Sequence, residues 1–75
     1  MNMKQKFADT VGLKKITIYA LLNGTRNAVG YSALNLSQAT GTSIEIWFPP
    51  KNVEEKSKIV LARQAAFQLW AETHN

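Results

Sequence analysis

The side chains with the clearest chemical potential are cations in the first third of the chain. Lys4, Lys14, Lys15 and Arg26 fall within a stretch whose one acidic residue is Asp9. The first fifty residues carry a net charge of +3 and the remainder +1, within a total of +4. A basic surface favours polyanions such as nucleic acid, although many ordinary domains are as basic.

Side chains that could catalyse a reaction or bind a metal are poorly placed. The single histidine, His74, is next to the last residue, where we expect a frayed helix end and no metal or nucleophile site. Glu54 and Glu55 are adjacent, which on a helix aims them about 100° apart. Asp9 has no acidic neighbour, and the chain has neither cysteine nor a glycine-rich phosphate loop. We therefore expect a protein that is not an enzyme and uses no cofactor or metal.

Residues 4–23 place small and apolar residues where a helix-turn-helix requires them. Ala8 is the small residue where two helices would cross, and Gly12 suits the left-handed turn that ends the first helix. The expected buried positions around them are Phe7, Val11, Leu13, Ile18 and Leu21. The second helix then presents Lys14, Lys15, Ile16, Tyr19, Ala20 and Asn23 on its outer side, as a helix that reads the major groove of DNA does.

A β-hairpin is the local alternative for the second helix, residues 15–23. Ile16, Thr17 and Ile18 are β-branched, and Asn23-Gly24 is a strong hairpin turn signal. The alternation of apolar and polar residues is lost over residues 19–22, however, so the pattern favours a helix.

Two cations begin this second helix, where a capping residue or an acid is usual. A residue that breaks a local rule is a candidate for function. Phosphates or guanine edges near this helix end would make Lys14 and Lys15 favourable contacts, and Lys14 is an expected phosphate contact. The alternative is that both lysines are simply solvated.

The whole sequence predicts an all-α fold of four to five helices. Gly24 and Gly41 are expected to follow helix ends, Thr42 and Glu45 to form a capping box, and Asn52 to cap the last helix. Pro49-Pro50 is the one clear break. The expected helices are residues 4–11, 15–23, 32–40, 43–47 and 53 to about 73. We expect residues 1–48 to form a DNA-binding region, 49–52 a linker, and 53–75 a C-terminal helix that completes the core, dimerises, or both.

The C-terminal helix has an apolar stripe that needs a partner. Residues with alternating three- and four-residue spacing, broadened by two aromatic residues, form the expected dimer interface: Ile59, Ala62, Ala66, Phe67, Leu69 and Trp70. The helix could fold back on its own chain, cross to a second chain, or simply be the last core helix of a monomer. Trp47 and Trp70 are expected as core or interface anchors and not as platforms for single strands.

The chain resembles the phage repressor and Cro-like helix-turn-helix family. The resemblance covers roughly residues 4–48 and is carried by FADTVGLKKITIYALLNG and ALNLSQATGTSIEIW. It implies a homodimeric transcriptional regulator, a repressor from a phage, plasmid or other mobile element, on a palindromic duplex operator. The resemblance places Lys15, Ile16, Tyr19, Ala20 and Asn23 at base-facing positions and Lys4, Thr25, Arg26 and Asn27 at phosphate-binding positions. Asn23 has a second possible role, to end the helix beside Gly24.

This sequence departs from the family at its start. Members carry a glutamine at the position of Lys4 and a whole helix before the motif, which ordinarily covers the face formed by Phe7, Val11 and Leu21. We expect the C-terminal helix to replace it.

Two other functions stay open. The segment ATGTSIEIW resembles that of antitoxins, which gives an antitoxin with a toxin partner that represses its own operon. A helical protein-interaction module without nucleic-acid binding is the third. Apolar runs shorter than a membrane span and the lack of a signal-peptide pattern lead us to expect a soluble cytoplasmic protein without a membrane partner.

Overall fold

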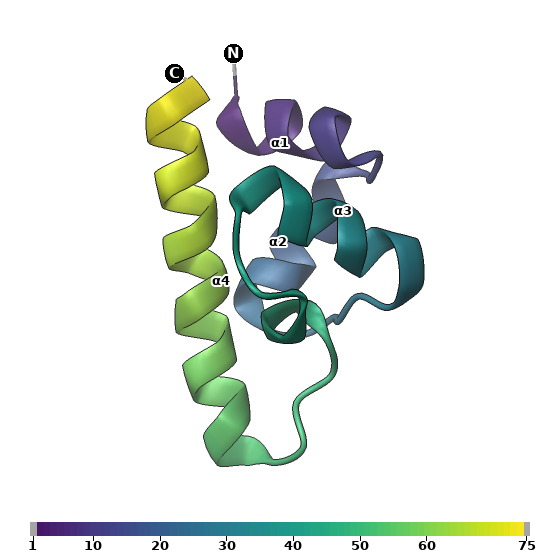
Figure 1. Ribbon diagram of the computed structural model, residues 1–75, viewed down its shortest axis with the longest axis vertical. Helices are drawn as coiled ribbons and strands as arrows, with labels where there is room; N and C mark the ends of the chain where they lie inside the picture. Colours follow the sequence, from purple (N-terminus) through teal and green to yellow (C-terminus); the bar gives the residue numbers. More distant parts are fainter. Residues whose placement is uncertain (1, 75) are drawn as a thin grey trace.

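A computed structural model describes residues 2–74 and shows an all-helical chain (Figure 1). Residues 15–23 form a helix, so the predicted all-α class is confirmed and the hairpin alternative is wrong. The elements are α1 (Met3–Val11), α2 (Lys15–Asn23), α3 (Gly30–Thr40), the 3-10 helix η1 (Ile44–Trp47) and α4 (Val53–His74).

Helices α1 and α2 each end on a glycine with positive φ. Gly12 has φ 74° and Gly24 has φ 84°, in the left-handed region that costs other residues free energy. Gly24 meets a second constraint, because a Cβ at this position would lie 2.7 Å from Cγ2 of Val60 in α4. The expected glycine at the end of α2 therefore also permits the close approach of α4.

The start of η1 differs from the expected capping box. Ser43, not Thr42, is the N-cap, and its Oγ accepts a hydrogen bond from the amide of Glu45 at 3.2 Å. Thr42 belongs instead to the turn that ends α3, where its amide donates to the carbonyl of Ser37. The extended backbone that a cap requires thus begins one residue later than predicted.

The connection into α4 follows the prediction. Phe48 is extended, with φ −75° and ψ 161°, before the Pro49-Pro50 pair. Oδ1 of Asn52 accepts a hydrogen bond from the amide of Glu55 at 2.8 Å, which confirms this residue as the cap of the last helix.

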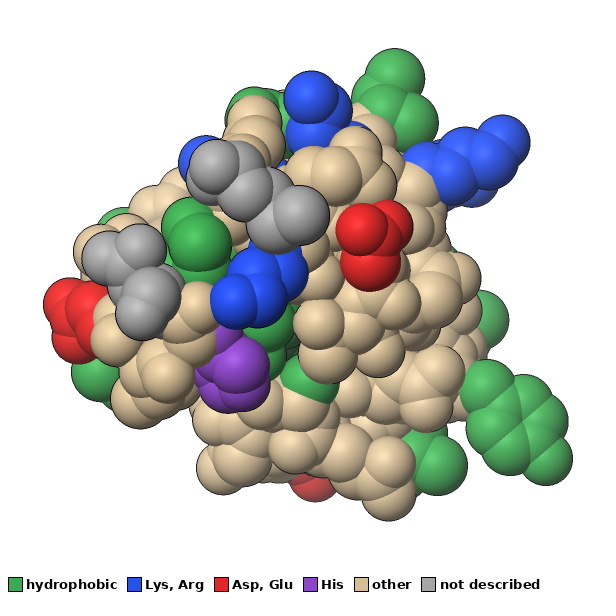
Figure 2. Space-filling model, turned by 90° about the horizontal axis from the view of Figure 1, so that it is seen from above, with side chains coloured by type: hydrophobic (Ala, Val, Ile, Leu, Met, Phe, Trp, Pro, Cys, Tyr) green, Lys and Arg blue, Asp and Glu red, His purple; other side chains and the backbone are tan. Residues whose placement is uncertain are grey.

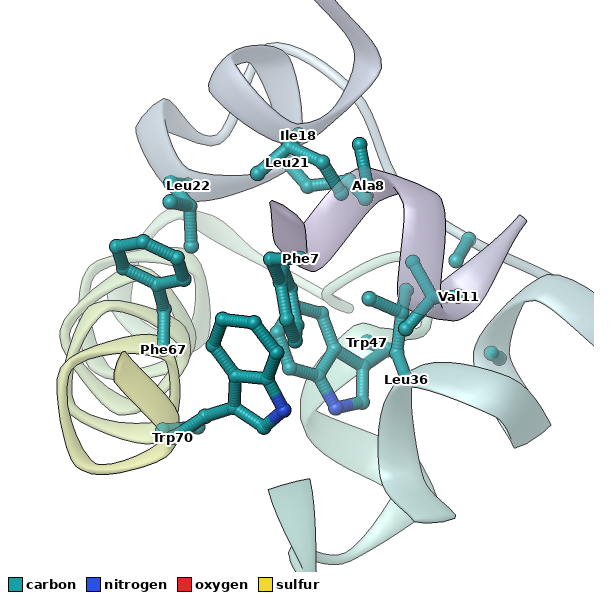
Figure 3. Packing of buried hydrophobic residues seen from close by; sticks show 13 residues of the cluster. Phe7, Ala8, Val11, Ile18, Leu21, Leu22, Leu36, Trp47, Phe67 and Trp70 are labelled. Carbon is teal, nitrogen blue, oxygen red and sulfur yellow. The ribbon is translucent and has the colours of Figure 1, made fainter. Parts of the chain in front are cut away.

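Helix α4 runs along one side of the molecule and packs on its own chain (Figure 1). Phe7 of α1 is fully buried where it meets Phe67 and Trp70 of α4, with ring centroids 5.3 Å and 4.8 Å apart. Figure 3 shows Phe7 between these rings and Trp47. Of the expected buried positions, Phe7, Val11, Ile18 and Leu21 are buried, and so is Ala8, the expected crossing residue. Leu13, in the turn between α1 and α2, is half-buried.

The buried face of α4 corrects the expected stripe. Ile59, Ala66, Phe67 and Trp70 are covered by their own chain, so in this fold they are not exposed to a second copy. Ala62 is half-buried, and Leu69 is 63% exposed. The apolar residues of α4 lie on two faces of the helix, and spacing alone merged them into one stripe.

The end of α4 is held and not frayed as expected. The His74 ring stacks on Trp70 with centroids 4.4 Å apart, and Nζ of Lys6 donates to the His74 carbonyl at 2.6 Å. Figure 2 shows the histidine beside a cationic side chain. Helix α1 is thereby tied to the last turn of α4.

Candidate nucleic-acid interface

The outer side of α2 carries the residues expected to face DNA bases. Lys15, Ile16, Tyr19 and Asn23 are exposed and Ala20 is half-buried, while Ile16 is 74% exposed without any covering element. A β-branched apolar side chain so exposed on a short helix contributes little to folding. Its methyl groups are available to contact another molecule, such as the methyl group of thymine.

The N-terminal end of α2 has no side-chain cap. Lys14 takes the extended cap conformation, with φ −83° and ψ 150°, but its side chain makes no capping hydrogen bond. The carbonyl of Lys14 accepts from the amides of Thr17 and Ile18. In the described chain, no hydrogen bond engages the ammonium of Lys14 or Lys15. The positive end of the helix dipole and two cations therefore add together at this point.

The residues after α2 divide into two groups. Arg26 is exposed, and no hydrogen bond joins its guanidinium to a described residue. Thr25 and Asn27, also expected at phosphates, are used within the fold: Thr25 Oγ1 donates to Asn23 Oδ1 at 2.7 Å, and Asn27 Oδ1 accepts from Arg63 at 2.9 Å. Of this set, Arg26 keeps its whole polar group for a ligand.

Asn23 serves the turn that follows α2. Its Oδ1 accepts from both the amide and the hydroxyl of Thr25, at 2.9 Å and 2.7 Å. Bidentate recognition of adenine needs both the oxygen and the nitrogen of the side-chain amide. Because the oxygen is already occupied, the geometry favours the helix-ending role for Asn23.

Lys4 lies against the aromatic side chains beside α2. Its Nζ is 5.1 Å from the ring centroid of Tyr19 and 5.3 Å from that of Phe67, within cation–π range. A surface hollow in this region is lined by Lys4, Tyr19 and Asn23 together with residues of α4. Lys4 therefore places a positive charge beside Tyr19.

The start of α3 lies close to the start of α2. Leu13 and Thr17 line a hollow together with Val29 and Ser32. Val29, the N-cap residue of α3, provides no side-chain cap, and it is 67% exposed. Two helix starts without side-chain caps thus border one hollow, and helix N-termini in general favour anions.

Arg63 is a buried cation that the sequence analysis did not predict. It is 1% exposed, and its guanidinium uses all five N–H donors: Nε to the Ile46 carbonyl, Nη1 to Leu21 and Arg26, and Nη2 to Phe48 and Asn27, at 2.6 to 3.1 Å. Burial lowers the pKa of Arg63 from its usual value, but a guanidinium remains charged in proteins. One cation thus joins the end of α2, the loop after it and η1 to α4.

A signal for Arg63 exists in the sequence. It lies four residues after Ile59 and three before Ala66, on the face of α4 that is otherwise apolar. A single arginine at such a position must find acceptors when the face is buried.

Two other kinds of feature, a metal site and a membrane-spanning helix, were sought among the described residues. Residues 2–74 contain no group of three His, Cys, Asp or Glu side chains arranged to bind a metal ion. None of the helices described is both long and apolar enough to cross a membrane.

Comparisons with known proteins do not identify a relative. No family model matches the chain, and searches of curated proteins and of solved structures find no match. The interpretation of the α2 surface therefore depends on its own residues.

Proposed function

We propose that this protein binds duplex DNA in a sequence-selective way and acts as a transcriptional regulator, with α2 in the major groove. The observation that carries the proposal is the N-terminal end of α2, where two exposed lysines take the place of a cap. The charge and the unsatisfied amides match a phosphate group.

The side chains next to this end suit the same ligand. Lys15 can donate to guanine O6 and N7, and Ile16 can contact a thymine methyl group. Arg26 and the uncapped start of α3 line the same hollow, where the sugar–phosphate backbone would run beside the groove. Lys15, Ile16 and Tyr19 are the proposed base contacts, and Lys14 and Arg26 the proposed phosphate contacts.

Salt-dependent binding to duplex DNA tests this proposal. We expect Lys15→Ala to reduce the affinity for a selected duplex more than the affinity for a random one. Arg26→Ala should reduce both affinities and lower the slope of affinity against salt concentration by about one. Lys51→Ala is the matched control, since Lys51 is an exposed cation in the loop before α4.

Two results would contradict the proposal. One is the absence of binding to any duplex at low salt. The other is an equal loss in all three variants, because that would indicate attraction of a general positive charge and no defined surface.

A further inference from the structure

The face of α4 that points away from the core carries apolar residues without a partner in the chain. Leu61 is 67% exposed and Leu69 is 63% exposed, and the exposed Ala65 lies midway between them. At about 100° per residue, these three positions fall within one side of the helix, opposite the buried Arg63 and Trp70. Figure 1 shows the rest of the molecule on one side of α4 only.

The outer face is symmetric in sequence about Ala65. Leu61 and Leu69 are four residues before and after it, while Lys58 and Glu72, both exposed, are seven residues before and after it. In two antiparallel helices related by a two-fold axis at Ala65, each Leu61 meets a Leu69 and each Lys58 meets a Glu72. A parallel pair would instead oppose lysine to lysine and glutamate to glutamate.

We propose that this outer face of α4 is a homodimer interface, with a second copy bound antiparallel around Ala65. A small central residue lets the helix backbones approach closely, and the charges at each end are complementary to the same surface on the other copy. The interface differs from the one expected from the sequence, because it uses the exposed face of α4 and leaves the buried face in the core.

The small apolar area sets the strength of this dimer. Stable interfaces bury about 800 Å² on each partner, more than a few side chains of one helix face supply. The dimer therefore forms in a concentration-dependent equilibrium, and the two charge pairs contribute a substantial share of its specificity. None of this depends on DNA binding, so either proposal can fail alone.

Single cysteines test the antiparallel arrangement directly, because the chain has none of its own. A mixture of the Leu61→Cys and Leu69→Cys variants, one of them tagged, should form the mixed disulfide about tenfold faster than either variant forms its own. Ala65→Cys should also form a disulfide with itself. Ser57→Cys is exposed and lies on the same side of α4, but the antiparallel arrangement holds its two copies about 24 Å apart, so it is the control for random collision. Self-disulfides that form as fast as the mixed one, or rates no higher than for Ser57→Cys, would overturn the arrangement.

Exchange of charges tests the pairing without a covalent bond. Sedimentation equilibrium should show Lys58→Glu and Glu72→Lys each raising the dimer Kd about three- to tenfold, and the double exchange returning it to within about twofold of the original. Lys51→Glu makes the same charge change away from the face and should leave the Kd unchanged. Equal mixing of the two single variants should restore dimers. A chain that stays monomeric at millimolar concentration would overturn the proposal and leave this face to another protein.

Discussion

At the C-terminal end of α2, the carbonyls of Leu21 and Leu22 accept hydrogen bonds from Arg63 and Gln64 of α4. At the N-terminal end of the same helix, Lys14 provides no cap. One end is therefore completed by its own chain, while the other keeps donors and positive charge at the surface.

The contrast extends to the cations themselves. Arg63 gives all five donors to the fold, whereas the exposed Lys15 and Arg26 give none of their side-chain donors to the described residues. The cations that complete the structure and those proposed to bind DNA are thus separate groups. Substitutions at the two ends should accordingly separate stability from binding.

The largest expected effect is on the attachment of α4. Trp70→Ala should lower the free energy of unfolding by about 3 to 5 kcal/mol, because it removes a 3% exposed side chain packed on Phe7. Leu69→Ala is the neighbouring control and should change it by less than about 1 kcal/mol, since Leu69 is exposed. Urea denaturation at a low protein concentration measures both. Equal losses would contradict the burial of α4 in its own chain.

Arg63 comes next, at the completed end of α2. Arg63→Met keeps the length of the side chain but leaves buried carbonyl oxygens without donors, so we expect a loss of about 3 kcal/mol. Arg63→Lys should recover part of this, because an ammonium has three donors and lacks the planar arrangement. Arg26→Met is the control for loss of a cation and should stay within about 0.5 kcal/mol. A full recovery in Arg63→Lys would show that charge alone is needed.

The sequence predicts those parts of this fold that local signals determine. Glycines after α1 and α2, the Pro49-Pro50 break and the Asn52 cap act on their immediate neighbours, so they locate helix ends without knowledge of the fold. The exact bounds of α2 and the exposure of its outer side follow from these signals and from the apolar spacing.

The remaining features depend on contacts between distant segments. The acceptors of Arg63 come from α2, the loop after it and η1, which no spacing within α4 can reveal. The choice between Leu69 and Trp70 for the core likewise depends on where Phe7 lies. The sequence is compatible with Asn23 as a base contact or as a turn residue. Only the hydrogen bonds from Thr25 to its side-chain oxygen distinguish the two roles.

A smaller effect is expected at Gly24, where α2 ends against α4. Gly24→Ala should lower the free energy of unfolding by about 2 kcal/mol. This is the sum of a left-handed backbone penalty and the close contact of the new Cβ with Val60. Gly12→Ala shares the positive φ but has open space around the Cβ, so it should cost about 1 kcal/mol. Thermal unfolding of the two variants measures the difference. Equal costs would mean that Val60 moves aside without a penalty.

Asn23, at the same end of α2, should contribute about 1 kcal/mol to the free energy of unfolding. Asn23→Ala removes the acceptor of the two Thr25 hydrogen bonds and should lower the melting temperature. Asn23→Asp keeps the acceptor, so its melting temperature should stay close to that of the original protein. Selection from random duplexes should give the same preferred site for Asn23→Ala as for the original protein. A relaxed preference at one base pair without loss of stability would instead identify Asn23 as a base contact.

An effect of similar size but opposite sign is expected at the uncapped end of α2. Lys14 already has the extended conformation of a cap. In Lys14→Asp the new carboxylate can therefore accept hydrogen bonds from the amides of the first turn, and its negative charge interacts favourably with the positive end of the helix dipole. We expect the free energy of unfolding to rise by about 1 kcal/mol while affinity for duplex DNA falls and the salt slope decreases by about one. Lys51→Asp, with the same change of charge in the loop before α4, should alter neither quantity appreciably. A stabilised Lys14→Asp protein that binds DNA as tightly as the original would show that this helix end is not where the phosphate lies.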